Sequence, residues 1–234
     1  VYPEEIGEEE AEKVGKAYGT FTQAEKVLVG RDGRKHGEKV SQAFVEGVKS
    51  TGTDVLDAKM VPTPVIYHAM REKGIESAAI VTASHNPPEY TGFKFCLEDA
   101  LAMSREGGMK RIEDIYESGS FDSGEGSLET VDIVEEYVEA VADTLSLQDS
   151  LEVAVNFGNG VAGPAGTRML ERLGCDVREI NSEVDGDFPN HLPDPTDEAA
   201  QQALIEQMDG EDLGIIIDGD GDRAGFVVPG YGYV

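Results

Sequence analysis

The stretch LEVAVNFGNGVAGPAGTRMLERLGCDVREI, residues 151–180, passes from an apolar run through a glycine-rich turn into an amphipathic segment and a second apolar run. The first run, Leu151–Phe157, predicts a buried strand, and Val177–Ile180 predicts another. Between them Pro164–Leu173 predicts a helix, because proline is favoured in a first helical turn and Gly174 follows as a stop signal. A strand, a crossover helix and another strand form the repeating unit of α/β proteins.

The same alternation extends through the rest of the chain. It predicts strands at Val27–Gly30, Asp54–Ala58, Ala78–Thr82 and Gly214–Ile217, and helices at 8–19, 36–50, 109–117, 134–145 and Thr196–Met208, the last capped by Thr196. The segment GSFDSGEGS, Gly119–Ser127, has no apolar period and indicates a loop near a domain boundary. We therefore expect an α/β fold of two consecutive domains, residues 1–128 and 129–234, each a mostly parallel mixed sheet flanked by helices.

The composition is strongly acidic: 47 Asp and Glu side chains stand against 19 Lys and Arg, for a net charge of −28. Such a charge repels nucleic acid and excludes binding through phosphate contacts. No apolar stretch approaches the length of a membrane helix, and the opening VYPEEIGEEE is not a signal peptide. Cys96 and Cys175 lack zinc-site spacing and are expected as reduced thiols, with a single disulfide as the alternative. We expect a cytoplasmic protein with no nucleic-acid or membrane partner.

The acidic side chains are dispersed along the chain, so their mutual repulsion should destabilise the fold at low ionic strength. Salt relieves this repulsion, since the screening length falls to roughly 3 Å at 1 M. We hypothesise a halophilic source with a high-salt cytoplasm; the alternative is an ordinary acidic protein. The hypothesis predicts that the melting temperature rises across a series reaching molar salt, and a flat series would defeat it.

The first of three candidate sites is TASHNP, Thr82–Pro87, which follows a predicted buried strand. Open α/β sheets bind ligands just past the carboxyl ends of their strands. Ser84 at this place can be a nucleophile or a phosphoryl carrier, and His85 supplies an imidazole. Lys94, a little further on, could act as an acid or base or neutralise phosphate charge. The alternative is a turn capped by Ser84 and Asn86, with His85 exposed.

The second candidate site is DGDGDR, residues 218–223, which follows the last predicted strand. Its carboxylates belong to Asp218, Asp220 and Asp222. Alternate residues of an extended segment point the same way, and carboxylate oxygens without sulfur or imidazole suit a hard cation such as Mg²⁺. An EF-hand loop is excluded, because it requires glycine where Arg223 stands and glutamate where Pro229 stands. A solvated acidic turn is the alternative.

The third candidate is GNGVAG, residues 158–163, a G-x-G-x-x-G pattern between a predicted strand and helix. It points to a dinucleotide-binding oxidoreductase, for which titration with NAD would be the test. The fingerprint normally opens the first unit of its domain, whereas about 150 residues of organised chain precede it here. The alternative is a tight strand-to-helix turn without a ligand.

Taken together, four segments resemble the α-D-phosphohexomutase superfamily, specifically its phosphomannomutase/phosphoglucomutase branch. They are VGRDGR (29–34), VPTP (61–64), TASHNPPEYTGFKF (82–95) and DGDGDR (218–223), in the order typical of that family. In that family the glycine turn of the second domain binds no dinucleotide. The resemblance therefore favours a structural turn at residues 158–163.

The resemblance implies that Ser84 carries a phosphoryl group in the resting enzyme and that the three aspartates bind Mg²⁺ together with the Ser84 phosphate. Phospho-Ser84 would donate to a hexose 1- or 6-phosphate, and the other phosphate of the bound 1,6-bisphosphate would return to Ser84. Lys94 is the candidate general acid/base, and His85 and Arg223 are candidate stabilisers of the transferring group. Arg31 is a weaker candidate, which could as easily hold its loop to neighbouring carboxylates.

The sequence departs from the family pattern in two ways. The GTSGIRG-like opening of the family is not in this sequence, and neither are its third and fourth domains, which in that family recognise the sugar and the non-reacting phosphate, so we expect a fragment of a longer enzyme. The ending VVPGYGYV, residues 227–234, also looks unlike a continuation of the metal-loop strand. We therefore expect metal and phosphoserine chemistry on mannose and/or glucose phosphates with little mutase turnover by this chain alone, and normal activity in a coupled assay would overturn that. A binding protein that has lost catalysis is a further alternative, against which acid-stable phosphate on Ser84 would argue.

Overall fold

The computed structural model describes residues 1–234, and the contacts within it divide the chain into two compact units. Unit 1 consists of Val1–Arg31, His36–Ala83 and Glu89–Asp132. Unit 2 consists of Asp32–Lys35, Ser84–Pro88 and Ile133–Val234. Two short loops that interrupt unit 1 in the sequence therefore belong to unit 2. The predicted boundary between residues 128 and 129 stays a prediction.

Unit 1 is built on a six-stranded sheet in the order β5-β4-β3-β1-β2-β6. Its strands are β1 (Lys26–Arg31), β2 (Asp54–Met60), β3 (Ala78–Val81), β4 (Phe93–Leu97), β5 (Leu101–Ala102) and β6 (Leu128–Thr130). Its helices are α1 (Glu8–Thr22), α2 (Gly37–Lys49), α3 (Thr63–Lys73) and α4 (Lys110–Ser118), with short helical turns at Glu98–Ala100 and Arg105–Met109. The pairs β1–β2, β1–β3 and β2–β6 are parallel, while the pairs β3–β4 and β4–β5 at one edge are antiparallel.

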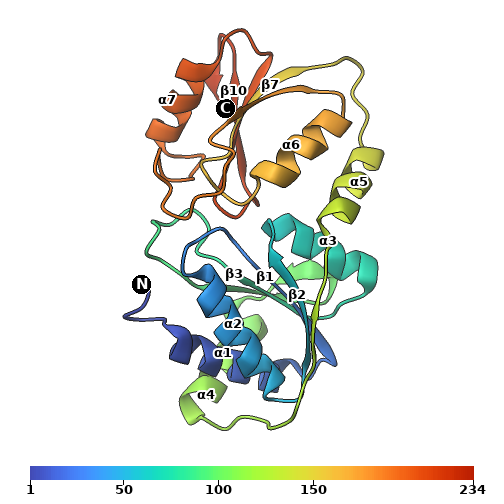
Figure 1. Cartoon of the computed structure of the whole chain (residues 1–234), viewed down its shortest axis with the longest axis vertical. Coiled ribbons are helices and arrows are strands. Elements are labelled where there is room, and N and C mark those ends of the chain that lie inside the picture. Colours follow the sequence, from blue (N-terminus) through green and yellow to red (C-terminus); the bar gives the residue numbers. More distant parts are fainter. The chain divides into compact units, whose positions relative to one another are not determined.

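Helices cover both faces of this sheet, with α1, α2 and α4 on one side and α3 on the other (Figure 1). Successive side chains of a strand point to opposite faces, so the run of apolar residues in β1 makes both faces of the sheet apolar. Both faces are therefore covered by helices. Val27 and Val29 pack with Tyr18 of α1 and Phe44 of α2. At Gly30 the sheet lies close to α3, since a Cβ there would be 2.8 Å from the Cδ1 atom of Ile66.

Unit 2 is built on a five-stranded sheet in the order β11-β10-β9-β7-β8. Its elements are α5 (Val134–Thr144), β7 (Glu152–Asn156), α6 (Gly163–Arg172), β8 (Asp176–Ile180), α7 (Glu198–Gln207), β9 (Leu213–Ile217), β10 (Ala224–Val228) and β11 (Gly232–Tyr233). Strands β8, β7 and β9 are parallel, and β10 and β11 add an antiparallel edge. Helices α6 and α7 lie on opposite faces of this sheet (Figure 1).

The two mixed sheets flanked by helices confirm the predicted fold class. Two local predictions are wrong. Thr196 does not cap α7; Asp197 does, because its carboxylate accepts a hydrogen bond from the Ala199 amide at 2.9 Å. The ending does continue the sheet, since β10 pairs with β9 and then turns into β11. No helix of the chain is both long and apolar enough to cross a membrane.

Candidate active site

The serine predicted to carry chemistry lies at the start of a loop just past the carboxyl end of β3. Ser84 is buried and adopts a left-handed backbone conformation with φ of 54°, which is uncommon for a residue with a side chain. Its carbonyl oxygen lies against the acidic turn of unit 2, where a Cβ at Gly219 would come within 2.6 Å of it. The glycine at that position therefore allows the serine loop and the acidic turn to meet.

The acidic turn connects β9 to β10 and brings three carboxylates together. Oxygens of Asp218, Asp220 and Asp222 lie within 4.8 Å of one another, and the first two residues are fully buried. The turn is closed by the backbone, where the Asp218 amide donates to the Arg223 carbonyl at 3.1 Å and the Gly221 amide donates to the Asp218 carbonyl at 3.0 Å. Burial and then the neighbouring charge of Asp220 raise the pKa of Asp218 well above its usual value.

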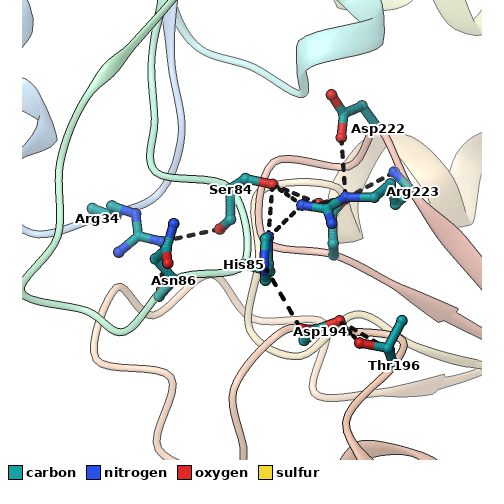
Figure 2. Close-up of polar contacts among 9 residues, drawn as sticks. Arg34, Ser84, His85, Asn86, Asp194, Thr196, Asp222 and Arg223 are labelled. Carbon is teal, nitrogen blue, oxygen red and sulfur yellow. Dashed lines mark hydrogen bonds and ion pairs between the residues drawn. The ribbon is translucent and has the colours of Figure 1, made fainter.

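Ser84 and the acidic turn are joined directly, although they lie 134 positions apart in the chain. The Ser84 hydroxyl donates a hydrogen bond to Asp218 Oδ2 at 3.0 Å. Arg223 donates from Nη2 to the same hydroxyl oxygen and from Nε to Asp218 Oδ2 at 3.2 Å. Its Nε also lies 3.8 Å from a carboxylate oxygen of Asp222. Figure 2 shows the Arg223 guanidinium turned toward Ser84 and His85. The serine oxygen thus lies between a carboxylate and a guanidinium.

His85 links this group to a second carboxylate. Its Nδ1 lies 3.4 Å from the Ser84 hydroxyl oxygen and accepts a hydrogen bond from Arg223, so the ring proton of the neutral imidazole is on Nε2. That Nε2 lies 3.9 Å from Asp194 Oδ2. Partial burial opposes the ionisation of Asp194, but hydrogen bonds from the amide and hydroxyl of Thr196 and favourable electrostatic interactions with His85 and Arg223 outweigh it, so the pKa of Asp194 is lowered. A negative charge therefore faces the ring.

The residues of the acidic turn fit a divalent cation. The donor set is three carboxylates with no sulfur or imidazole, which is the chemistry that Mg²⁺ prefers. Two of the three carboxylates are fully buried, where like charges at this separation repel one another strongly unless a cation lies among them. The Ser84 oxygen, hydrogen-bonded to Asp218, adjoins the same cluster.

The structure gathers six of the eight predicted site residues in unit 2: Ser84, His85, Asp218, Asp220, Asp222 and Arg223. The other two belong to unit 1. Lys94 lies on β4, paired with Ile80 of β3, and Arg31 ends β1 beside Asp57 and Lys59. The roles of Lys94 and Arg31 stay predictions.

Two residues that contact the predicted group were not predicted, Arg34 and Asp194, and Asp32 is the ion-pair partner of Arg34. Arg34 and Asp32 belong to VGRDGR, in which only Arg31 is a predicted site residue. Asp194 opens an Asp-Pro-Thr turn in which the aspartate accepts from the amide two residues on, a pattern that favours a fixed carboxylate. The sequence shows both the VGRDGR segment and the Asp-Pro-Thr turn, but it does not show that they contact Ser84 and His85.

The glycine turn at residues 158–163 is packed against the chain itself. A Cβ at Gly160 would lie 2.9 Å from the Gly219 carbonyl oxygen, and a Cβ at Gly163 would lie 2.2 Å from the Ser182 carbonyl oxygen. Gly158 has a φ of 53°, as a tight turn requires. These glycines therefore serve close backbone packing.

Comparison with known families matches nearly the whole chain. "Phosphoglucomutase/phosphomannomutase, alpha/beta/alpha domain I" matches residues 1–123, and domain II of the same family matches residues 135–231. The chain belongs to the phosphoglucomutase/phosphomannomutase family, within the α-D-phosphohexomutase superfamily. The alternative of a dinucleotide-dependent oxidoreductase has no support from these matches.

Individual relatives agree with this assignment. A phosphomannomutase/phosphoglucomutase of Pseudomonas aeruginosa is 38% identical over 92% of this chain and 47% of its own length. A phosphomannomutase of Salmonella montevideo is 34% identical over 94% of this chain and 51% of its own. A crystal structure of a family protein from Burkholderia thailandensis superposes with a TM-score of 0.90 at 36% identity, covering 97% of this chain and 52% of that one. The chain thus spans about half the length of the relatives it matches.

Proposed function

We propose that this chain is the phosphoserine-bearing and metal-binding part of a phosphohexomutase that interconverts hexose 1-phosphate and hexose 6-phosphate, with mannose and/or glucose as the sugar. The observation that supports this most is the hydrogen bond from Ser84 to Asp218, because it joins a hydroxyl to a cluster of three carboxylates and an arginine. The enzymes named among its relatives act on these sugar phosphates.

In the proposed reaction Ser84 carries the phosphoryl group. The bond from phosphorus to Ser84 Oγ breaks as a sugar hydroxyl oxygen bonds to phosphorus, and Lys94 receives the proton that the hydroxyl loses. The departing Oγ takes up one proton from solvent. In the second half Ser84 Oγ bonds to the phosphorus of the other phosphate of the hexose 1,6-bisphosphate and loses its proton to solvent. The bond from that phosphorus to the sugar oxygen breaks, and Lys94 returns a proton to the sugar oxygen. Two transfers in opposite directions convert one monophosphate into the other.

The positive groups near Ser84 suit the charge that develops in such a transfer. Arg223 already donates to the Ser84 oxygen, so it would stabilise negative charge as the oxygen departs. His85 contacts both Arg223 and the Ser84 oxygen through Nδ1. When protonated, its ring would donate a hydrogen bond to a transferring phosphoryl oxygen. Arg31 would be a further cation for the phosphate.

Asp218, Asp220 and Asp222 would hold Mg²⁺, together with an oxygen of the Ser84 phosphate. When bound, the ion would neutralise phosphate charge and orient the phosphoryl group for in-line displacement. Asp218 would face both the ion and the serine. Its side chain is held in place by full burial and by its contacts with Ser84 and Arg223.

Exchange of a phosphoryl group with a hexose 1,6-bisphosphate tests this proposal. The purified chain, first discharged with a hexose monophosphate, is given Mg²⁺ and either glucose or mannose 1,6-bisphosphate. We expect the intact mass to rise by one phosphoryl group and hexose monophosphate to form in equal amount. An unchanged mass with both sugars would overturn the proposal.

We also propose a cytoplasmic enzyme adapted to high salt. The two cysteines are free thiols in different units, as expected in a reducing compartment, and burial raises the pKa of the Cys96 thiol to about 11. The net charge of −28 supports adaptation to salt, for which the melting series described above is the test.

A further inference from the structure

The side chain of Arg34 is almost completely buried, at 1% exposure. Its guanidinium donates hydrogen bonds to the main chain of the serine loop, residues 84–88. Nη2 donates to the carbonyl oxygens of Ser84 at 2.9 Å and Asn86 at 2.7 Å, and Nη1 donates to that of Pro87 at 2.5 Å. Figure 2 shows Arg34 approaching the main chain of Ser84, while Arg223 and His85 approach its hydroxyl. One side chain therefore fixes three of the five residues of loop 84–88.

We propose that Arg34 is a positioning residue for phosphoryl transfer, which sets the conformation of the serine loop and thereby the direction of the Ser84 hydroxyl. This inference rests on the proposed function of Ser84. The guanidinium hydrogen bonds of Arg34 go to main-chain carbonyls of the loop, whereas those of Arg223 go to the Ser84 hydroxyl and Asp218. It acts on the reaction through the backbone of the residue that carries the phosphate.

Arg34 is well suited to this task because it is held rigidly from its other side. Asp32 Oδ2 accepts a hydrogen bond from Arg34 Nε at 3.1 Å, and Asp32 Oδ1 accepts from the Arg34 amide at 3.1 Å. The guanidinium also lies over the Phe188 ring, 5.2 Å from its centroid. A Cβ at Gly186 would lie 2.7 Å from the Arg34 Cα, so the main chain on both sides is closely packed.

The backbone of Ser84 explains why such a restraint is needed. A left-handed conformation is disfavoured for serine, so an unrestrained loop would spend most of its time elsewhere in φ and ψ. Rotation about φ and ψ redirects both the carbonyl and the side chain of the same residue. Hydrogen bonds to the carbonyls of Ser84 and its neighbours therefore select the conformation in which Oγ reaches Asp218 and Arg223.

The arrangement also explains why loops 32–35 and 84–88 belong to unit 2 rather than to the unit that surrounds them in sequence. The first loop is anchored by the ion pair of Lys35 with Asp187 and by the close packing at Gly186. The second is bound to the first through Arg34. The serine is thereby connected to the acidic turn through contacts made entirely inside unit 2.

Arg34→Lys is the informative substitution. Lysine keeps the charge that pairs with Asp32, but its single ammonium cannot reproduce a planar fork that reaches three carbonyls. We expect the rate of phosphoryl uptake by Ser84 from a hexose 1,6-bisphosphate to fall on the order of 100-fold, since misplacement by about 1 Å can cost that much. The Mg²⁺ dissociation constant, measured by titration, should stay within about threefold of wild type, because the aspartate cluster is untouched.

Two controls separate positioning from loss of stability. Arg178→Lys alters another ion-paired arginine of unit 2, bound to Glu211, and should leave the uptake rate unchanged. Leu204→Ala makes a cavity in the core of the same unit and lowers the melting temperature without touching the loop. In Arg34→Ala, millimolar guanidinium should restore part of the uptake rate with saturation, whereas it should not speed Leu204→Ala.

Uptake by Arg34→Lys at the wild-type rate, or a loss no larger than in a Leu204→Ala variant of equal melting temperature, would overturn the positioning role. An Arg34→Ala variant that folds but shows no response to guanidinium would overturn it as well. If the wild-type protein takes up no phosphate, the proposed function itself fails. If the wild type and Arg34→Lys take up phosphate at the same rate, only the positioning role fails.

Discussion

Ser84→Ala should take up no phosphate at all from a hexose 1,6-bisphosphate, under conditions where the wild-type chain gains one phosphoryl group. The hydroxyl is the proposed acceptor, and it is the group that lies between the Asp218 carboxylate and the Arg223 guanidinium. Alanine keeps the backbone but has no oxygen to form the ester. Intact mass before and after treatment measures the effect directly.

Ser118→Ala is the matched control, because Ser118 is an exposed serine at the end of α4 in unit 1. It should take up phosphate as the wild type does. Ser84→Ala should also keep Mg²⁺ affinity to within a few fold, since the unphosphorylated serine is not needed to bring the aspartates together. A phosphoryl gain that persists in Ser84→Ala would place the acceptor on another residue.

Asp220→Asn should lower the affinity for Mg²⁺ on the order of 100-fold, because the number of charged oxygen ligands governs the affinity of such sites. Asparagine matches the shape of aspartate in a fully buried position but carries no charge. Without metal the same variant should be at least as stable as wild type, since the charge of Asp220 is one of the causes that raise the pKa of Asp218. Metal titration and metal-free melting curves measure the two effects.

Asp176→Asn, an exposed position on β8 of the same unit, removes one charge from the surface and should change neither quantity. If Asp220→Asn bound Mg²⁺ as tightly as wild type, the three carboxylates could not be the ion's ligands. If it were strongly destabilised without metal, Asp220 would have a structural role in place of the repulsion described here.

Patterns that are local in sequence were predicted well. The apolar runs at Val27–Gly30 and Gly214–Ile217 lie in strands β1 and β9. They could be recognised because a strand that is covered on both faces is apolar throughout. Helix α3 was missed, although Pro64 in its first turn and Gly74 after its end are both recognised markers. Strand β6 has no apolar pattern, since all three of its residues are exposed and only its pairing with β2 defines it.

The site divides in the same way. DGDGDR could be assigned from its own spacing, because three carboxylates on one turn need no distant partner to converge. The meeting of Ser84 with Asp218 could be expected only from the family resemblance, since no local pattern joins residues so far apart. Arg34 could not be assigned, because a buried arginine is explained by its acceptors, and these lie about fifty positions away on loop 84–88. Long-range partners are what the sequence alone leaves open.

Whether the metal ion and the Ser84 phosphate are immediate neighbours can be measured by phosphorus NMR. The chain phosphorylated on Ser84 is titrated with Mn²⁺ in place of Mg²⁺, and the Asp220→Asn variant is treated in parallel. We predict that one equivalent of Mn²⁺ broadens the phosphoserine resonance beyond detection in the wild type and leaves it sharp in the variant. A wild-type resonance that stays sharp while Mn²⁺ is bound would contradict a shared site for the serine phosphate and the three aspartates.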